Sequence, residues 1–191
     1  MKNDLELLEE FVATFDKLSE MAEFTGIYPI VSELAVGELD EFGHTKWQPS
    51  PVKTERRFLD DLYAKLPGRL PPLFETLLLF YRWADVDLQL FTLLANPPAP
   101  DLSRFYEQIS GDPGLWKCLI PSGYIRFAKG PDMDYDPVCF DIKRRRNNKD
   151  CPVVKIDHEE ILCNNRIKVV GELAPGFREL VQQTIDKAKS V

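Results

Sequence analysis

The stretch LPPLFETLLLFY at residues 70–81 decides the expected fold. It is apolar almost all the way round, and a helix of that kind is buried on most of its faces. Pro72 suits the first turn of such a helix, and the residues before it form a stiff turn. We therefore predict a helix over residues 72–83 at the centre of the hydrophobic core.

Apolar residues recur at helical spacing on both sides of this central segment. Asn3 and Glu6 form a capping-box-like start for a long amphipathic helix over residues 4–24. Residues 30–51 have a weaker pattern that allows one hairpin. The other predicted helices cover residues 54–65 with Thr54 as cap, 101–109 with Asp101 as cap, a short segment after Pro113, one turn at 158–162, and 175–187.

Alternating or short apolar runs predict strands at residues 86–94, 124–128, 138–143, 153–157 and 166–170. The third and fourth of these form a hairpin whose tip is the basic run KRRRNNK, residues 143–149. Helices precede strands and a final helix closes the chain, which indicates an α+β fold with a mostly antiparallel sheet packed with helices. We assign residues 1–50 to an N-terminal extension and residues 51–191 to the α+β domain.

Charge is concentrated at one end of the chain. The 191 residues have a formal net charge of -7, and residues 1–46 hold 11 acidic and 3 basic residues, a balance of -8. Such an acidic surface favours basic partners and repels phosphate backbones. No apolar run approaches the ~20 residues of a membrane-spanning helix, so a cytoplasmic protein is expected. The four cysteines lack CxxC spacing and are expected to be free thiols.

No catalytic motif is complete. His158-Glu159-Glu160 begins like the HExxH zinc motif, but Leu162 stands where the second histidine is needed. A cysteine nucleophile with His158 and Asp157 is not favoured, because adjacent side chains on an extended segment point in opposite directions. The chain contains no G-x-S-x-G elbow, Walker loop or G-x-G-x-x-G. We therefore predict no catalytic residue, no metal and no cofactor.

Two charged clusters remain. Asp132, Asp134 and Asp136 begin like a calcium loop, but an EF-hand needs glycine and glutamate at later positions that differ here. We interpret them as an acidic turn, and leave open a weak cation site or a contact for a basic partner. The basic run 143–149 lacks interleaved aromatic residues, so we interpret it as a solvated tip and predict no nucleic-acid binding.

Four segments in order resemble the SUKH superfamily, which includes fungal cell-wall-assembly regulators of the Smi/Knr type and many bacterial immunity proteins. They are LPPLFETLLLFY at 70–81, DPVCFD at 136–141, PVVKIDHE at 152–159 and LAPGFRELV at 173–181. The resemblance covers about residues 54–185. The chain departs from the family pattern at residues 82–85, where an Asn-Gly turn is common. It also has Gly176 in place of a serine, so a cap contact at the last helix is expected to be missing.

This resemblance implies a non-enzymatic protein-binding domain, and an immunity-type role would mean binding and neutralising a toxin. A basic toxin such as a nuclease would suit an acidic surface. The expected partner contacts are Glu33, Glu38, Asp40, Glu41, Asp132, Asp134 and Asp136. A regulatory or scaffold protein with no toxin link is the alternative. A small-molecule or metal-dependent enzyme would be favoured if polar groups converged around His158 in a deep pocket.

Overall fold

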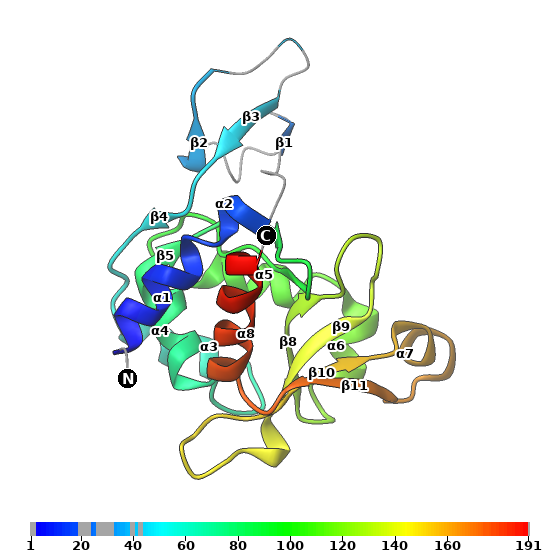
Figure 1. The fold of residues 1–191 in the computed structure, drawn as a ribbon. Helices are drawn as coiled ribbons and strands as arrows, with labels where there is room; N and C mark the ends of the chain where they lie inside the picture. Colours follow the sequence, from blue (N-terminus) through cyan, green and yellow to red (C-terminus); the bar gives the residue numbers. More distant parts are fainter. Residues whose placement is uncertain (1–2, 19–23, 26–32, 39–40, 42–43, 191) are drawn as a thin grey trace.

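The computed structural model describes residues 3–18, 24–25, 33–38, 41 and 44–190. Figure 1 shows a twisted sheet with helices on both of its faces, and a small strand arm projecting from the body. The helices are α1 (Asp4–Val12), α2 (Phe15–Leu18), α3 (Arg57–Tyr63), α4 (Pro72–Phe80), α5 (Ser103–Ser110), α6 (Pro113–Leu119), α7 (His158–Asn164) and α8 (Phe177–Ser190), with a 3-10 helix η2 at Ile142–Arg144.

The main sheet has six strands in the order β11-β10-β9-β8-β7-β6, and all of its pairs are antiparallel. Its strands are β6 (Val86–Asp87), β7 (Thr92–Leu93), β8 (Tyr124–Lys129), β9 (Pro137–Asp141), β10 (Val153–Ile156) and β11 (Val169–Ala174). The arm is formed by β1 (Phe24–Thr25), β3 (His44–Trp47) and β2 (Ala35–Val36), while β4 (Ser50–Pro51) pairs with β5 (Tyr81–Arg82). The predicted α+β fold with an antiparallel sheet is confirmed.

The strand alternation sends side chains to two different clusters. On β8, Ile125 and Phe127 enter the main core, whereas Tyr124 packs against a second, smaller cluster. On β9, Phe140 belongs to the main core and Cys139 to the second cluster. Helices α4, α8 and α1 cover the first face of the sheet, and α6 and α7 cover the second (Figure 1). The sheet is therefore buried on both faces along its central strands.

Phe74 on α4 is the centre of the main core. Its ring lies 5.4 Å from that of Phe127, 5.1 Å from that of Phe140 and 5.1 Å from that of Phe177 between centroids. All three contacts are close to edge-to-face, a favourable geometry for aromatic pairs. One side chain thus joins the central helix to two sheet strands and to the last helix.

The first two helices pack into this same core. Leu8, Phe11 and Phe15 are buried in the main cluster, and the ring of Phe11 lies 6.3 Å from that of Phe177. At the surface, Lys189 of α8 forms an ion pair with Glu10 at 2.9 Å. The helix predicted over residues 4–24 is instead two shorter helices, α1 and α2. Between them the hydroxyl of Thr14 donates to the carbonyl of Phe11, a side-chain contact that competes with the regular helix hydrogen bonds. Residues 19–23 lie outside the part of the chain that the structure describes.

The central helix ends at Phe80, three residues before the predicted end. Tyr81 is extended, with φ -139° and ψ 150°. The carbonyl of Leu78 accepts from both Arg82 and Asn96, so side chains satisfy the helix end and the chain leaves it as β5. Thr54 is not a helix cap as predicted, because its hydroxyl faces Arg82 Nη2 at 2.6 Å and α3 begins at Arg57.

Three strand predictions were wrong in extent. The strand predicted over residues 138–143 ends at Asp141, and the next residues form the 3-10 helix η2. The segment 86–94 is a hairpin of two short strands, because Gln89 has a φ of 62° and its backbone N–H donates to the Asp87 carboxylate at 2.7 Å. The last strand runs over Val169–Ala174 rather than residues 166–170, after Asn165 ends α7 in the left-handed conformation. Among the described residues, no helix has both the length and the apolar composition needed to cross a membrane.

The last helix is capped from another segment. Asp150, which is buried, accepts from the backbone N–H of Phe177 at 3.0 Å and of Arg178 at 3.4 Å. A Cβ on Gly176 would lie 2.6 Å from Asp150 Oδ2 and 2.2 Å from Arg146 Nη2. Glycine therefore leaves room for the Asp150 carboxylate, and the cap expected to be missing at this helix is supplied from the β9–β10 loop.

The substitution Phe74→Ala is expected to destabilise the chain by about 3–5 kcal/mol, since it leaves a cavity among the surrounding rings. Urea unfolding followed by circular dichroism measures the change. Leu5→Ala, at an exposed position on α1, is the control and should change the free energy of unfolding by less than about 0.5 kcal/mol. Similar effects of the two substitutions would contradict the central role of Phe74.

The substitution Gly176→Ser is expected to destabilise the chain by about 1 kcal/mol or more, because the new Cβ crowds the capping carboxylate. Asp150→Ala should cost about 0.5–2 kcal/mol, the usual effect of losing a helix cap. In the Asp150→Ala background the serine should cost less than in the wild type, since one of the crowding groups is gone while Arg146 and Glu179 remain. A double-mutant cycle measured by urea unfolding tests this coupling; additive effects would contradict it.

Candidate functional site

The turn between β8 and β9 is held by its own acidic residues. The backbone N–H of Asp136 donates to Asp134 Oδ1 at 2.9 Å, and that of Asp132 donates to Asp87 Oδ2 at 2.7 Å. A Cβ on Gly130 would lie 2.2 Å from the Asp134 Cγ, so the turn needs glycine where that carboxylate folds back. The local sequence therefore builds a compact turn.

Two of the three predicted acidic residues in this turn are neutralised within the chain. Lys155 Nζ lies 2.9 Å from Asp134 Oδ2 and 3.7 Å from Asp136 Oδ2, and His158 Nδ1 lies 2.7 Å from Asp136 Oδ1. Partial burial is the largest single influence and acts to raise the pKa of Asp134, but the hydrogen bonds from Lys155 and from the Asp136 backbone, together with the charge of Lys155, lower the pKa overall. The hydrogen bond to Asp134 raises the pKa of Lys155. The carboxylate of Asp132 remains exposed.

His158 pairs with Asp136 and not with Asp157, its neighbour in the sequence. Asp157 caps α7 by accepting from the Glu160 N–H at 3.1 Å, and it pairs with Lys168 at 2.9 Å. Asp136 Oδ1 accepts from the backbone N–H of His158 as well as facing its ring. This contact favours the tautomer with the proton on Nδ1, and Nε2 has no partner among the described residues. That nitrogen can accept a hydrogen bond, or donate one when the ring is protonated.

A cavity of about 290 Å³ lies beside this pair. Strand β8, the start of α6, helix α7 and the acidic turn each contribute to its wall. Its lining consists of Asp112, Leu115, Arg126, Lys129, Tyr135, His158 and Leu162. Polar groups therefore do converge around His158, on the second face of the sheet.

The two cations of this cavity have few protein partners. Arg126 Nη2 donates to the Gln108 carbonyl at 3.3 Å, while its Nε is buried without any acceptor. Burial lowers the pKa of Arg126. Lys129 Nζ lies 5.4 Å from the centroid of the Tyr135 ring, and within the described ranges it has no carboxylate at ion-pair distance. The carboxylates of Asp85 and Asp112 act on Arg126, and Asp85 also acts on Lys129, but neither cation forms an ion pair with a described residue.

The sequence analysis did not identify Arg126, Lys129 or Tyr135. One signal was present: Arg126 interrupts the apolar strand pattern at residues 124–128 with a charged residue. In the sheet Arg126 is paired in register with Cys139, on the face that α6 and α7 cover. Only the packing of these two helices shows that the arginine enters a cavity rather than solvent.

The remaining predicted acidic residues lie elsewhere. Glu33, Glu38 and Glu41 are exposed in and around the arm, and none has an ion-pair partner among the residues that the structure describes. Asp40 lies outside the described residues. The arm and the β8–β9 turn occupy different parts of the molecule (Figure 1). The seven predicted contacts are therefore not one continuous cluster.

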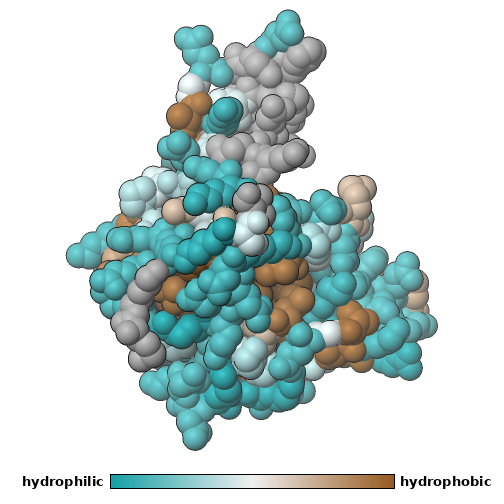
Figure 2. Space-filling view, viewed as in Figure 1, coloured by the Kyte–Doolittle hydropathy of each residue, from teal (hydrophilic) through white to brown (hydrophobic). Residues whose placement is uncertain are grey.

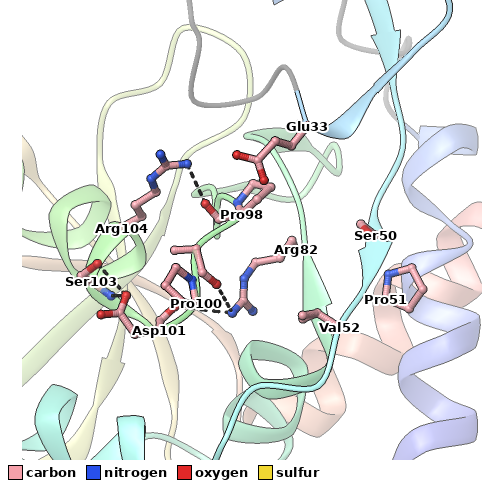
Figure 3. Close-up of a pocket in the computed structure, with 11 residues that line it drawn as sticks. Glu33, Ser50, Pro51, Val52, Arg82, Pro98, Pro100, Asp101, Ser103 and Arg104 are labelled. Atoms are coloured by element: carbon pink, nitrogen blue, oxygen red, sulfur yellow. Dashed lines mark hydrogen bonds between the residues drawn. The ribbon is translucent and has the colours of Figure 1, made fainter.

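A larger cavity, of about 530 Å³, lies beside Arg82 and includes Glu33 in its wall. Figure 3 shows Arg82 reaching the loop that carries Pro98, Pro100 and Asp101. Its guanidinium donates to oxygen atoms of Thr54, Leu78, Tyr81, Ala99 and Asp101. Because these contacts join α4 to the loop, we interpret Arg82 as structural and place the candidate site at the smaller cavity.

The basic run at the tip of the β9–β10 hairpin is partly neutralised. Arg144 pairs with Asp141 at 2.7 Å and with Glu172 at 3.0 Å, and Arg146 lies 3.1 Å from Glu179. These contacts favour the interpretation of a solvated tip. Within the described ranges, no three His, Cys, Asp or Glu side chains are grouped so that they could hold a metal ion.

All four cysteines are free thiols, and only Cys163 is exposed. In the sheet Cys139 is opposite Val154, so it is not the cross-strand neighbour of Cys151. Burial raises the pKa of Cys118 and of Cys139, and raises that of Cys151 to about 12. These three thiols are therefore poor nucleophiles at neutral pH.

Iodoacetamide at neutral pH is expected to label Cys163 and to leave the three buried thiols unmodified, because alkylation needs an accessible thiolate. Mass spectrometry of the folded chain should show one modification per molecule, and the unfolded chain should show four. Cys163→Ser is the control and should abolish labelling of the folded chain. Labelling of Cys118, Cys139 or Cys151 at a rate close to that of Cys163 would contradict the described burial.

The chain was compared with protein-family models, with curated proteins and with solved structures. None of the three comparisons finds a match.

Proposed function

We propose that this chain is a non-enzymatic protein-interaction domain that binds its partner through the β8–β9 turn and α7. The observation that carries the proposal is the exposure of large apolar side chains on the β8–β9 turn and α7, two of which, Tyr135 and Leu162, line the same cavity. Met133 is 78% exposed, Tyr135 54% and Leu162 55%. Side chains of this size are enriched in the centres of protein interfaces, and exposed apolar groups that lie together mark such sites.

Further apolar side chains are exposed on the edge strand of the sheet. Val169 and Val170 on the edge strand β11 are also exposed. Figure 2 shows a mostly hydrophilic face with brown apolar patches beside α8 and towards β10 and β11. An apolar centre with a polar rim is the usual anatomy of a protein interface.

The charge distribution supports a basic partner. Glu33, Glu38, Glu41 and Asp132 keep exposed carboxylates, and unpaired surface charge speeds the approach of an oppositely charged protein. Together with the resemblance to the SUKH superfamily, this supports an immunity-type role in which the partner is a basic toxin. We assign the role to the cytoplasm, where unpaired thiols like these stay reduced.

A regulatory or scaffold role with no toxin link is the second form of the proposal. It uses the same surface and differs in the partner. A toxin gene beside the gene for this chain would favour the immunity role, and an isolated locus would favour regulation.

Affinity capture from native lysate at low and high salt tests the proposal. The wild-type chain is expected to retain a partner that the double variant Tyr135→Ser/Leu162→Ser loses, because the variant removes the apolar contacts. Leu5→Ser, which changes an exposed leucine on α1, is the control and should retain the partner. Equal capture by the two variants would contradict the proposed surface.

The proposed attraction of a basic partner by exposed carboxylates is tested with matched charge reversals. Glu33→Lys, Glu38→Lys, Glu41→Lys and Asp132→Lys in one variant should weaken capture and reduce its salt dependence. The control reverses the same number of exposed acids at Asp60, Asp61, Glu107 and Asp186. Unchanged capture by the first variant, or an equal loss with the control, would count against a steering role for the four residues.

A further inference from the structure

The cavity beside His158 lacks a hydrogen-bond acceptor for its arginine. Arg126 uses Nη2 for one long contact with a backbone carbonyl, and the Nε–H is buried without a partner. A buried donor without an acceptor costs stability, and such groups are rare in folded proteins unless a further group completes them. The Nε–H groups of Arg82 and Arg146 are also buried without an acceptor among the described residues, so the difference lies in the two Nη groups: those of Arg82 donate to five protein oxygen atoms, whereas those of Arg126 have the one long contact.

The charged residues that line the cavity favour a ligand with a single negative charge. Arg126 and Lys129 are positive, and Asp112 is the acidic residue of the lining. Asp112 Oδ1 already accepts from the backbone N–H groups of Gly114 at 2.9 Å and Leu115 at 3.0 Å. Asp134 and Asp136 are engaged by Lys155 and His158. Asp85 and Asp112 act on Arg126, and Asp85 acts on Lys129, but none of them forms an ion pair with either cation. An added carboxylate would therefore meet two cations that have no ion-pair partner among the described residues.

The rest of the wall suits an apolar body. Leu115, Leu162 and the Tyr135 ring line the cavity beside the charged groups. Its volume of about 290 Å³ lies at the small end of ligand pockets, which span about 300–1,000 Å³. A guanidinium presents parallel N–H groups that match the two oxygens of a carboxylate.

We propose that this cavity binds a small monocarboxylate carried on an apolar or aromatic body. Arg126 and Lys129 hold the carboxylate, while Leu115, Tyr135 and Leu162 contact the body. His158 borders the site, and Asp136 fixes the orientation of its ring. This binding activity goes beyond the proposed protein interaction and does not depend on it, because the isolated chain supplies every group.

Isothermal titration of the purified chain with 3-phenylpropionate tests the site. Binding with a Kd of about 1 mM or tighter is expected for a ligand of this size. The neutral analogue 3-phenylpropanamide has the same shape without the charge and should bind at least about tenfold more weakly. Inorganic phosphate, which has no apolar body, should also bind more weakly. The free acid is compared with a short acidic peptide, and tighter binding of the peptide would overturn the assignment to a small molecule.

The variants Arg126→Gln and Lys129→Gln should each weaken 3-phenylpropionate binding, Arg126→Gln by at least about tenfold. Lys117→Gln removes one exposed positive charge from α6 outside the cavity and is the control; it should bind like the wild type. Circular dichroism checks that each variant is folded, and Lys129→Gln remains informative if Arg126→Gln unfolds. Undetectable binding to the wild type, equal binding of acid and amide, or full binding by both cavity variants would overturn the proposal.

Discussion

The packing of Phe74 against the rings of Phe127, Phe140 and Phe177 is the contact on which the rest of the structure depends. Phe127 and Phe140 themselves stack across β8 and β9, with centroids 4.0 Å apart and planes 8° from parallel. This aromatic group aligns the two central strands against α4 and α8. Once Phe127 and Phe140 point to the first face, the alternation of the strands sends Arg126 and Cys139 to the second.

The candidate site lies on that second face of the sheet. The central strands carry a small apolar cluster there, covered by α6 and α7, and the cavity lies where this cover ends beside the acidic turn. The acidic turn contributes by pairing with neighbouring side chains, because Asp134 holds Lys155 in place and Asp136 holds His158. The acidic turn thus acts as support for the site, while Tyr135 between those residues provides a wall.

The arginines of this chain illustrate three ways in which a protein treats a guanidinium. Arg144 pairs with the carboxylates of Asp141 and Glu172 at a partly exposed hairpin tip. Arg82 is buried and surrounded by backbone and hydroxyl oxygens, which makes it a link between a helix end and a loop. Arg126 is half-buried, with one long hydrogen bond. Of the three, Arg126 has the fewest protein acceptors for its guanidinium, so it is the one that a bound carboxylate would complete.

The sequence by itself determined the elements that depend on local pattern: the central helix after Pro72, the antiparallel pair β9 and β10 within a residue or two of their ends, and the last helix. Periodicity and prolines act over a few residues, so they can be seen in the chain alone. It did not determine that Thr54 would meet Arg82, that Asp150 would cap α8, or that His158 would pair with Asp136 instead of Asp157. Only the tertiary structure decided these contacts and the cavity beside them, because each joins side chains from segments far apart whose distance is set by the packing of the core.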